Sequence, residues 1–121
     1  MFEARVQSKF RLTRSEDFKR VRSIGKSYAH PLVVLVVQAC EISTQVRVGV
    51  TAGKTTGTAV HRNRAKRLLR EALRPYLKSF TSGWDLILIA RPPLVTATLE
   101  DTRAALDNLF RRAQILPADE S

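Results

Sequence analysis

Arg62-Asn63-Arg64-Ala65-Lys66-Arg67 is the stretch that decides the fold and the charge distribution of this chain. Read as a helix, at about 100° per residue, the segment from residue 59 to residue 74 divides into two faces. Its apolar residues recur at the spacing of a stripe that packs on a core, and they are Ala65, Leu68, Leu69, Ala72 and Leu73. The opposite face gathers Asn63, Lys66, Arg67, Arg70 and Arg74. The sequence therefore predicts an amphipathic helix with a cationic outer side.

The cations of this helix have little internal compensation. Glu71 is the one acid of the segment, and it can pair with Arg67, four residues earlier. Solvated helix faces usually mix both signs of charge and this one does not, which favours a surface that binds phosphate. Arg62 and Arg64 project toward the two edges of the apolar stripe. We expect them to brace the helix against its neighbours as well as to reach phosphate.

The composition of the whole chain supports this interpretation. The chain has 121 residues, a formal net charge of +10, a pI near 10.9 and 44% hydrophobic residues. These values are typical of one globular domain, residues 1–121, with a core of its own. The charge predicts a polyanionic partner, with nucleic acid first and an anionic membrane surface second.

Membrane and secretion signals are missing from the sequence. No apolar run approaches the roughly 18 residues of a membrane span, and the first residues lack the apolar region of a signal peptide. Cys40 is the single cysteine, which excludes an internal disulfide and fits a reducing compartment. We expect no membrane association and a cytoplasmic location.

Helix and strand signals alternate along the rest of the chain. Residues 1–14 carry scattered cations and form a basic arm that we expect to order on binding. Ser15 is a suitable N-cap for a helix that runs to about residue 23, where Gly25 ends it. Strands are predicted at residues 32–39, 45–51 and 85–90, with a hairpin loop at residues 41–44.

The strand, basic helix and strand in succession predict a βαβ unit. Thr58 is the expected N-cap of the basic helix, and Pro75 ends it. Thr98 caps a last helix, whose expected core residues are Leu99, Thr102, Leu106, Leu109, Phe110 and Ala113. The fold class is α+β, a small mixed sheet of three to four strands with three helices. The core is expected over about residues 15–113, and residues 115–121 are expected to form a frayed acidic end.

The sequence shows no residue group that could activate a water molecule. The 11 acids are scattered, and His30 and His61 lack partners at metal-ligand spacing. Gly53-Lys54-Thr55 suggests a P-loop, but Val48 stands where that motif requires its first glycine. From its residues alone the chain is a nucleic-acid-binding domain without a catalyst of its own. On helix periodicity Phe18 lies beside Val21 and faces a core.

Several short motifs together resemble the bacterial ribonuclease P protein component. They are Phe10-Arg11-Leu12, Asp17-Phe18, Arg47-Val48-Gly49-Val50-Thr51, Arg62-Asn63-Arg64, Lys66-Arg67, Arg70-Glu71 and Ala90-Arg91. The resemblance covers roughly residues 9–113. It implies an accessory subunit that helps a catalytic RNA remove the 5′ leader of precursor tRNA. It also implies a left-handed crossover at the basic helix. The Mg²⁺ ions are expected to be bound by the RNA, with none bound by the protein alone, and one protein is expected per catalytic RNA.

The resemblance assigns two binding regions. The region for the catalytic RNA comprises Arg62, Asn63, Arg64, Lys66, Arg67 and Arg70. The region for the leader comprises Phe18, Arg11, Arg14, Arg22 and Lys54, with the Phe18 ring exposed in a cleft where an unpaired base can stack. Arg22 stands where the family often has a second aromatic residue, and Thr55 where it often has a second lysine, so leader contacts are expected to rely on charge at the first helix. The alternative function is that of a small ribosomal or other structural RNA-binding protein.

Overall fold

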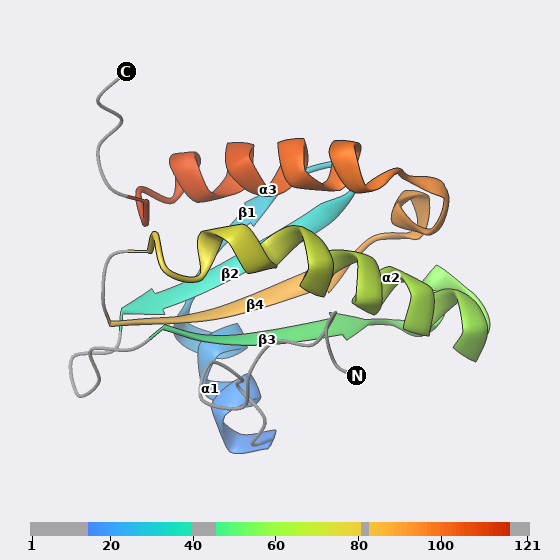
Figure 1. Ribbon diagram of the computed structural model, residues 1–121. Coiled ribbons are helices and arrows are strands. Elements are labelled where there is room, and N and C mark those ends of the chain that lie inside the picture. Colours follow the sequence, from blue (N-terminus) through green and yellow to red (C-terminus); the bar gives the residue numbers. More distant parts are fainter. Residues whose placement is uncertain (1–14, 40–45, 81–82, 117–121) are drawn as a thin grey trace.

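The described part of the chain forms one sheet with helices on both faces. The computed structural model describes residues 15–39, 46–80 and 83–116 (Figure 1). The helices are α1 (Ser15–Ile24), α2 (Ala59–Leu73) and α3 (Leu99–Arg112), and the strands are β1 (Lys26–Ala29), β2 (Val33–Ala39), β3 (Arg47–Ala52) and β4 (Trp84–Ala90). Short 3-10 turns are η2 (Lys54–Thr56), η3 (Arg74–Tyr76) and η4 (Pro92–Thr96). The predicted α+β class is confirmed.

The sheet is mixed, with the strand order β1-β2-β4-β3. β2 pairs antiparallel with both β1 and β4, whereas β3 and β4 are parallel. The hydrophobic pattern of the sequence predicts no strand before residue 32, so β1 was not predicted. β1 has four residues, all exposed or half-buried, so it shows no hydrophobic periodicity that could predict it.

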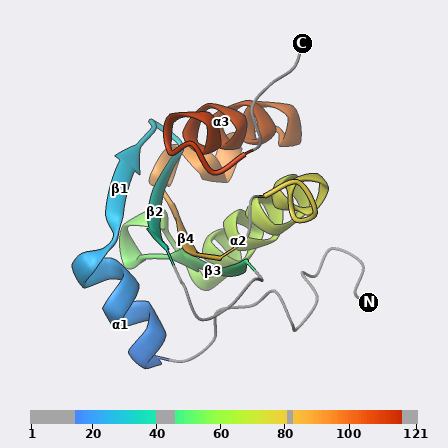
Figure 2. The same ribbon diagram turned by 90° about the vertical axis from the view of Figure 1, so that its left-hand side faces the viewer.

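The β3-α2-β4 crossover is left-handed. In Figure 1 both strands point to the right, with β4 above β3. The turned view of Figure 2 shows that α2 lies in front of the sheet in the view of Figure 1. When the strands are turned to point upward with α2 toward the viewer, β4 lies to the left of β3. This geometry departs from the right-handed rule for parallel connections, as the family resemblance implies.

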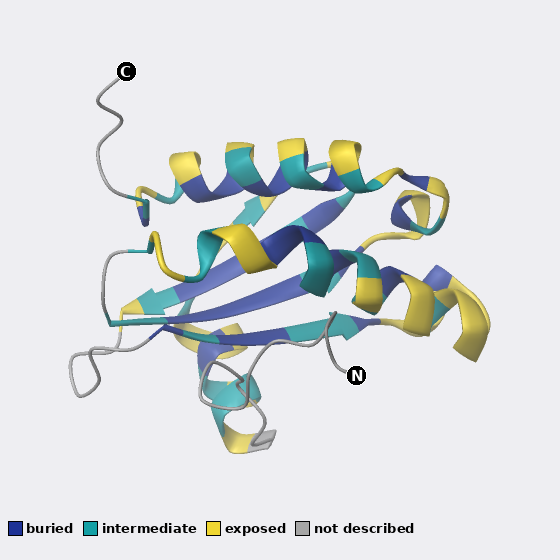
Figure 3. Cartoon of the chain, viewed as in Figure 1, coloured by how far each residue is buried: buried dark blue, intermediate teal, exposed yellow. Residues whose placement is uncertain are grey.

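The sheet separates α1 from α2 and α3 (Figure 2), and a hydrophobic core lies on each of its faces. α2 and α3 cover one face, and the larger core lies between them and the sheet. Phe110 is its largest fully buried side chain, and the rings of Tyr76 and Phe80 meet it edge-on at centroid distances of 5.2 and 4.8 Å. α1 crosses the other face over a smaller core of Val21, Val36 and Ile87. β2 and β4 are therefore buried on both faces over much of their length (Figure 3), which explains their continuous apolar runs.

The ends of the elements agree with the predicted caps in two places and correct the prediction in one. The Thr58 hydroxyl accepts from the His61 amide at 3.3 Å, and that of Thr98 accepts from the Asp101 amide at 3.0 Å, as predicted. The prediction of a frayed end over residues 115–121 is wrong for Ile115. Ile115 is fully buried in the larger core, because Gln114 takes a left-handed conformation (φ 61°) that turns the chain back after α3. The basic arm 1–14, the 41–44 loop, Cys40 and residues 117–121 lie outside the described residues.

Candidate nucleic-acid interface

The apolar stripe of α2 anchors the helix to the sheet and α3. Ala65, Leu69, Ala72 and Leu73 are fully buried, and Leu68 is half-buried against the same core. The predicted stripe is confirmed. This burial fixes the rotation of the helix, so the residues between the stripe positions are directed outward.

The outer side of α2 carries the predicted cations, with one change in pairing. Arg64, Arg67 and Asn63 are exposed, while Arg62, Lys66 and Arg70 are half-buried. Glu71 pairs with Arg74 at 3.2 Å, so the predicted pair with Arg67 is wrong. An acid is better placed N-terminal to its cation on a helix, and Glu71 precedes Arg74 but follows Arg67. Arg67 therefore keeps its charge without an ion pair to any described residue.

Arg62 and Arg64 are held by backbone carbonyl groups on either side of α2. Arg62 Nε donates to the carbonyl oxygen of Ala52 at 3.3 Å, and Arg64 Nε donates to that of Val95 at 2.9 Å. The predicted bracing of the helix is confirmed. A carbonyl accepts a hydrogen bond but carries no net charge, so both guanidinium groups stay cationic and keep further N–H donors for a ligand.

Phe18 lies on the other face of the sheet, at the margin of the smaller core. Its side chain is half-buried and packs against the Val21, Val36 and Ile87 cluster. The ring lies directly over Gly49 in β3, where an added Cβ would be 2.3 Å from the Phe18 Cζ atom. Gly49 is thus required by the close approach of this ring. The ring is neither a fully buried core residue nor a freely exposed one.

The other residues assigned to the leader are dispersed or not described. Arg22 is exposed on α1 and Lys54 is exposed in η2. No interaction among the described residues joins either of them to Phe18. Arg11 and Arg14 lie outside the described residues. The leader-binding region therefore stays a prediction.

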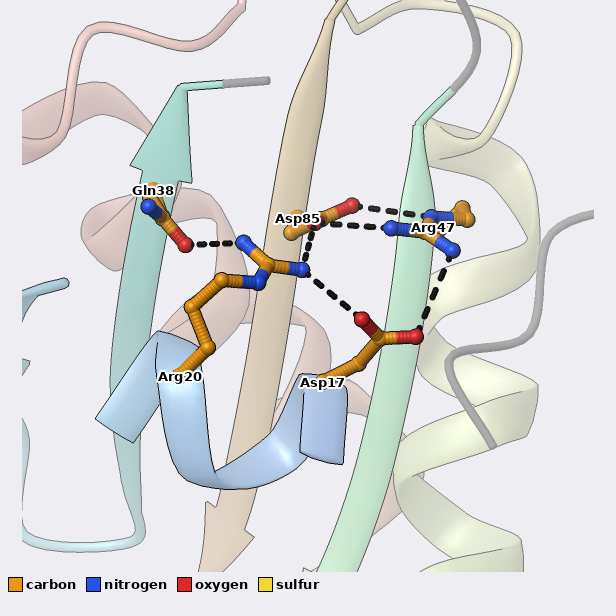
Figure 4. Close-up of polar contacts among 5 residues, drawn as sticks. All are labelled: Asp17, Arg20, Gln38, Arg47 and Asp85. Carbon is orange, nitrogen blue, oxygen red and sulfur yellow. Dashed lines mark hydrogen bonds and ion pairs between the residues drawn. The ribbon is translucent and has the colours of Figure 1, made fainter. Parts of the chain in front are cut away.

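A buried ionic cluster, which was not predicted from the sequence, fixes α1 on the sheet (Figure 4). Asp85 of β4 is 0% exposed. Arg47 of β3 donates two hydrogen bonds to the Asp85 carboxylate, from Nε and Nη2, each at 3.0 Å. Arg20 of α1 donates to the same carboxylate at 2.8 Å and to Asp17 at 3.1 Å. The Arg47–Asp17 pair at 3.6 Å closes the cluster, and Arg20 also donates to the Gln38 side chain.

This cluster determines where Phe18 lies. The hydrogen bonds to Asp85, and then to Asp17, raise the pKa of Arg20 above its ordinary value, so its charge is secured. Two carboxylates and two guanidinium groups balance one another, which is the condition for keeping an acid buried. Because Asp17 and Arg20 flank Phe18 on α1, they hold the ring over β3. The sequence signal was Asp85 itself, an acid directly before the apolar run 86–90.

The described part of the chain has neither a candidate metal site nor a candidate membrane span. There, no three His, Cys, Asp or Glu side chains gather in a group that could hold a metal ion. Nor does any described helix have the length and apolar character needed to cross a membrane.

The fold and α2 define a class of protein, a small α+β protein with an arginine-rich helix whose cationic side faces outward. The family model for ribonuclease P matches residues 6–114. The chain belongs to this family. A ribonuclease P protein component of Herpetosiphon aurantiacus is 41% identical over 110 residues, covering 91% of this chain and 89% of that protein. The component of Bacillus velezensis is 34% identical over 116 residues, covering 96% and 99% respectively.

Solved structures of the family have the same fold. The ribonuclease P protein of Staphylococcus aureus superposes with a TM-score of 0.80 at 27% identity, covering 88% of this chain and 97% of that chain. The protein of Thermotoga maritima superposes with a TM-score of 0.73 at 27% identity, covering 84% and 96%. The mixed sheet with its three helices is thus the architecture of the family.

Proposed function

We propose that this chain is the protein component of a bacterial ribonuclease P and binds the catalytic RNA of that enzyme through α2. The observation that carries the proposal is the geometry of α2. Its apolar stripe is buried, Arg62 and Arg64 are fixed by carbonyl groups, and Arg67 is exposed without an ion pair to the described residues. Fixed cations lose little conformational entropy on binding, so they suit an RNA backbone of defined shape.

The second part of the proposal concerns the 5′ leader of precursor tRNA. The half-buried Phe18 ring, on the face of the sheet that α1 crosses, is its candidate stacking residue, with Arg22, Lys54 and the basic arm as sources of positive charge. Leaders of different tRNAs differ in sequence, so contacts to phosphate and to base faces suit them better than base-specific hydrogen bonds.

The chemistry in this proposal belongs to the RNA. The protein supplies cations that lower the repulsion between catalytic RNA and precursor, which also helps the RNA to hold Mg²⁺ at lower concentrations of that ion. The protein contributes no catalytic residue, works in the cytoplasm, and binds the RNA in a 1:1 ratio.

Reconstitution tests the proposal directly. The protein is added to the cognate catalytic RNA, and cleavage of precursor tRNA is followed as a function of Mg²⁺ concentration. We expect the protein to lower the Mg²⁺ requirement and to favour precursor over mature tRNA in binding. A protein that binds RNA but leaves cleavage unchanged would indicate a structural RNA-binding protein, and cleavage by RNA-free protein that survives repurification would contradict the accessory role.

A further inference from the structure

Two kinds of partner hold arginine side chains within the described part of the chain. One group pairs with carboxylates and comprises Arg20, Arg47, Arg74 and Arg111. The other group donates to backbone carbonyl oxygens and comprises Arg62, Arg64, Arg91 and Arg112. Arg62 and Arg64 belong to the cationic helix α2. Arg91 and Arg112 lie outside α2.

The two kinds of partner have different electrostatic consequences. A carboxylate cancels the charge of the guanidinium group that it binds. A carbonyl oxygen holds the group in place through one of its five N–H donors and leaves the charge and the other donors available. An arginine anchored in this way is a preorganised anion-binding group, because its side-chain entropy is partly lost before the ligand arrives.

Arg91 and Arg112 are anchored at the same turn. Arg112, in the last turn of α3, donates from Nη1 to the carbonyl oxygen of Ala29 at 2.7 Å. Arg91, directly after β4, donates from Nη1 to that of the next residue, His30, at 3.2 Å. Two cations from distant parts of the sequence thus converge on the end of β1, and both are exposed.

A third cation and an aromatic ring complete the group. Lys26 Nζ and Arg112 Cζ each lie 5.8 Å from the centroid of the Tyr28 ring. Lys26 is exposed and Tyr28 is half-buried. None of the three cations forms an ion pair with a described residue. We call Lys26, Arg91, Arg112 and Tyr28 the β1-edge cluster.

The β1-edge cluster is separate from the cationic side of α2. β1 and β3 are the opposite edges of the sheet, and α2 packs over β3 and β4 whereas α3 packs over β1 and β2. Figure 2 shows α2 and β1 on opposite sides of the molecule. One RNA segment bound along α2 therefore leaves the β1 edge available to another.

We propose that the β1-edge cluster is a second RNA-binding surface, where Lys26, Arg91 and Arg112 contact backbone phosphates. The proposal rests on the proposed function, in which the protein contacts more than one RNA segment. Two ordinary roles account for part of the cluster, because lysine protects an edge strand from pairing and arginine complements a helix C-terminus. Neither role explains why Arg91 is fixed at the same turn, or why three cations gather there without an ion pair to any acid that the structure describes.

The test measures binding of the full-length protein to three RNAs, the cognate catalytic RNA, precursor tRNA and mature tRNA, over a range of salt concentrations. The variants are Arg112→Gln and the double variant Lys26→Gln/Arg112→Gln. Arg111→Gln is the matched control, because Arg111 is the exposed neighbour in the same helical turn and pairs with Asp107 at 2.8 Å. For at least one RNA, we expect the double variant to bind about 2- to 30-fold more weakly. The slope of log affinity against log salt should become shallower by about two.

The outcomes separate the two proposals. Arg111→Gln should bind within about twofold of wild type, and Arg112→Lys should retain most of the affinity. Equal affinity and equal salt slope for the double variant and wild type, with all three RNAs, would overturn the second surface. If Arg112→Gln unfolds, the single variant Lys26→Gln is used for the same binding test, because Lys26 is exposed and its replacement should leave the fold intact. A wild-type protein that does not stimulate precursor cleavage overturns the proposed function instead, while the variant affinities still report on the β1 edge.

Discussion

Replacing Phe18 separates its packing role from its proposed contact with the leader. Burying a phenylalanine completely is worth about 3–5 kcal/mol relative to alanine. Phe18 is half-buried against Gly49 and the smaller core, so Phe18→Ala should lower the free energy of unfolding by about 1.5–2.5 kcal/mol. A stacked base is worth about 1–3 kcal/mol, which corresponds to about a 5- to 150-fold loss of affinity for precursor tRNA.

Phe18→Leu is the variant that distinguishes the two contributions. Leucine keeps most of the apolar contact with Gly49, so stability should fall by less than about 1.5 kcal/mol. It offers no ring face, so the loss of precursor affinity should be close to that of Phe18→Ala. Phe18→Tyr keeps the aromatic face, so it is the control for stacking and should retain the affinity for precursor tRNA. Its stability is measured separately, because the added hydroxyl is attached to Cζ, the atom nearest Gly49.

Urea unfolding, followed by the fluorescence of the single tryptophan Trp84, measures stability. Paired binding assays of the reconstituted enzyme with precursor and mature tRNA measure the leader contribution. Mature tRNA lacks the leader, so its affinity for enzyme reconstituted with each of the three variants should equal its affinity for enzyme with the wild-type protein. Phe18→Leu with unchanged preference for precursor would refute the stacking role and leave Phe18 as a packing residue only.

The other predictions concern the cationic helix, the buried cluster and one tyrosine. Arg67→Gln should weaken binding of the catalytic RNA and change stability by no more than about 0.5 kcal/mol. The wild-type salt slope should be about −4 to −5 if about six phosphates are neutralised, and a slope near zero would rule out ionic contacts. Asp85→Asn should cost about 3–5 kcal/mol in urea unfolding because two guanidinium groups lose their buried partner. The Asp107→Asn control should cost about 1 kcal/mol or less, because Asp107 is only half-buried and its partner Arg111 is exposed. Equal losses in these two variants would contradict the role of the cluster. Removal from water, followed by the negative charge of Asp107, raises the pKa of Tyr76 above 10.0, so the folded state favours the neutral phenol. Its contribution to stability is complete below pH 10 and decreases as the pH rises further, and Tyr76→Phe should reduce this decrease in alkaline urea titrations.

The sequence by itself determined the features that depend on neighbouring residues. The amphipathic pattern of α2, its Thr58 cap, the Thr98 cap of α3 and the βαβ succession are all encoded within a few residues, because helix and strand periods are local. The bracing role of Arg62 and Arg64 also followed from their angular positions beside the apolar stripe. The motifs of the ribonuclease P family added the direction of the crossover, which no local pattern specifies.

Only the tertiary structure decided which charges are neutralised. Asp85 meets Arg20 and Arg47, which are 65 and 38 residues away in sequence, because the sheet order places β4 between β2 and β3 with α1 across them. Glu71 pairs with Arg74 and not with Arg67. The turn at Gln114 buries Ile115 in the larger core. Arg91 and Arg112 converge on carbonyl groups at the end of β1, a strand too short and too exposed to have a periodic pattern. An arginine has the same formal charge in every sequence, and its partner in the folded chain decides whether that charge remains available to RNA.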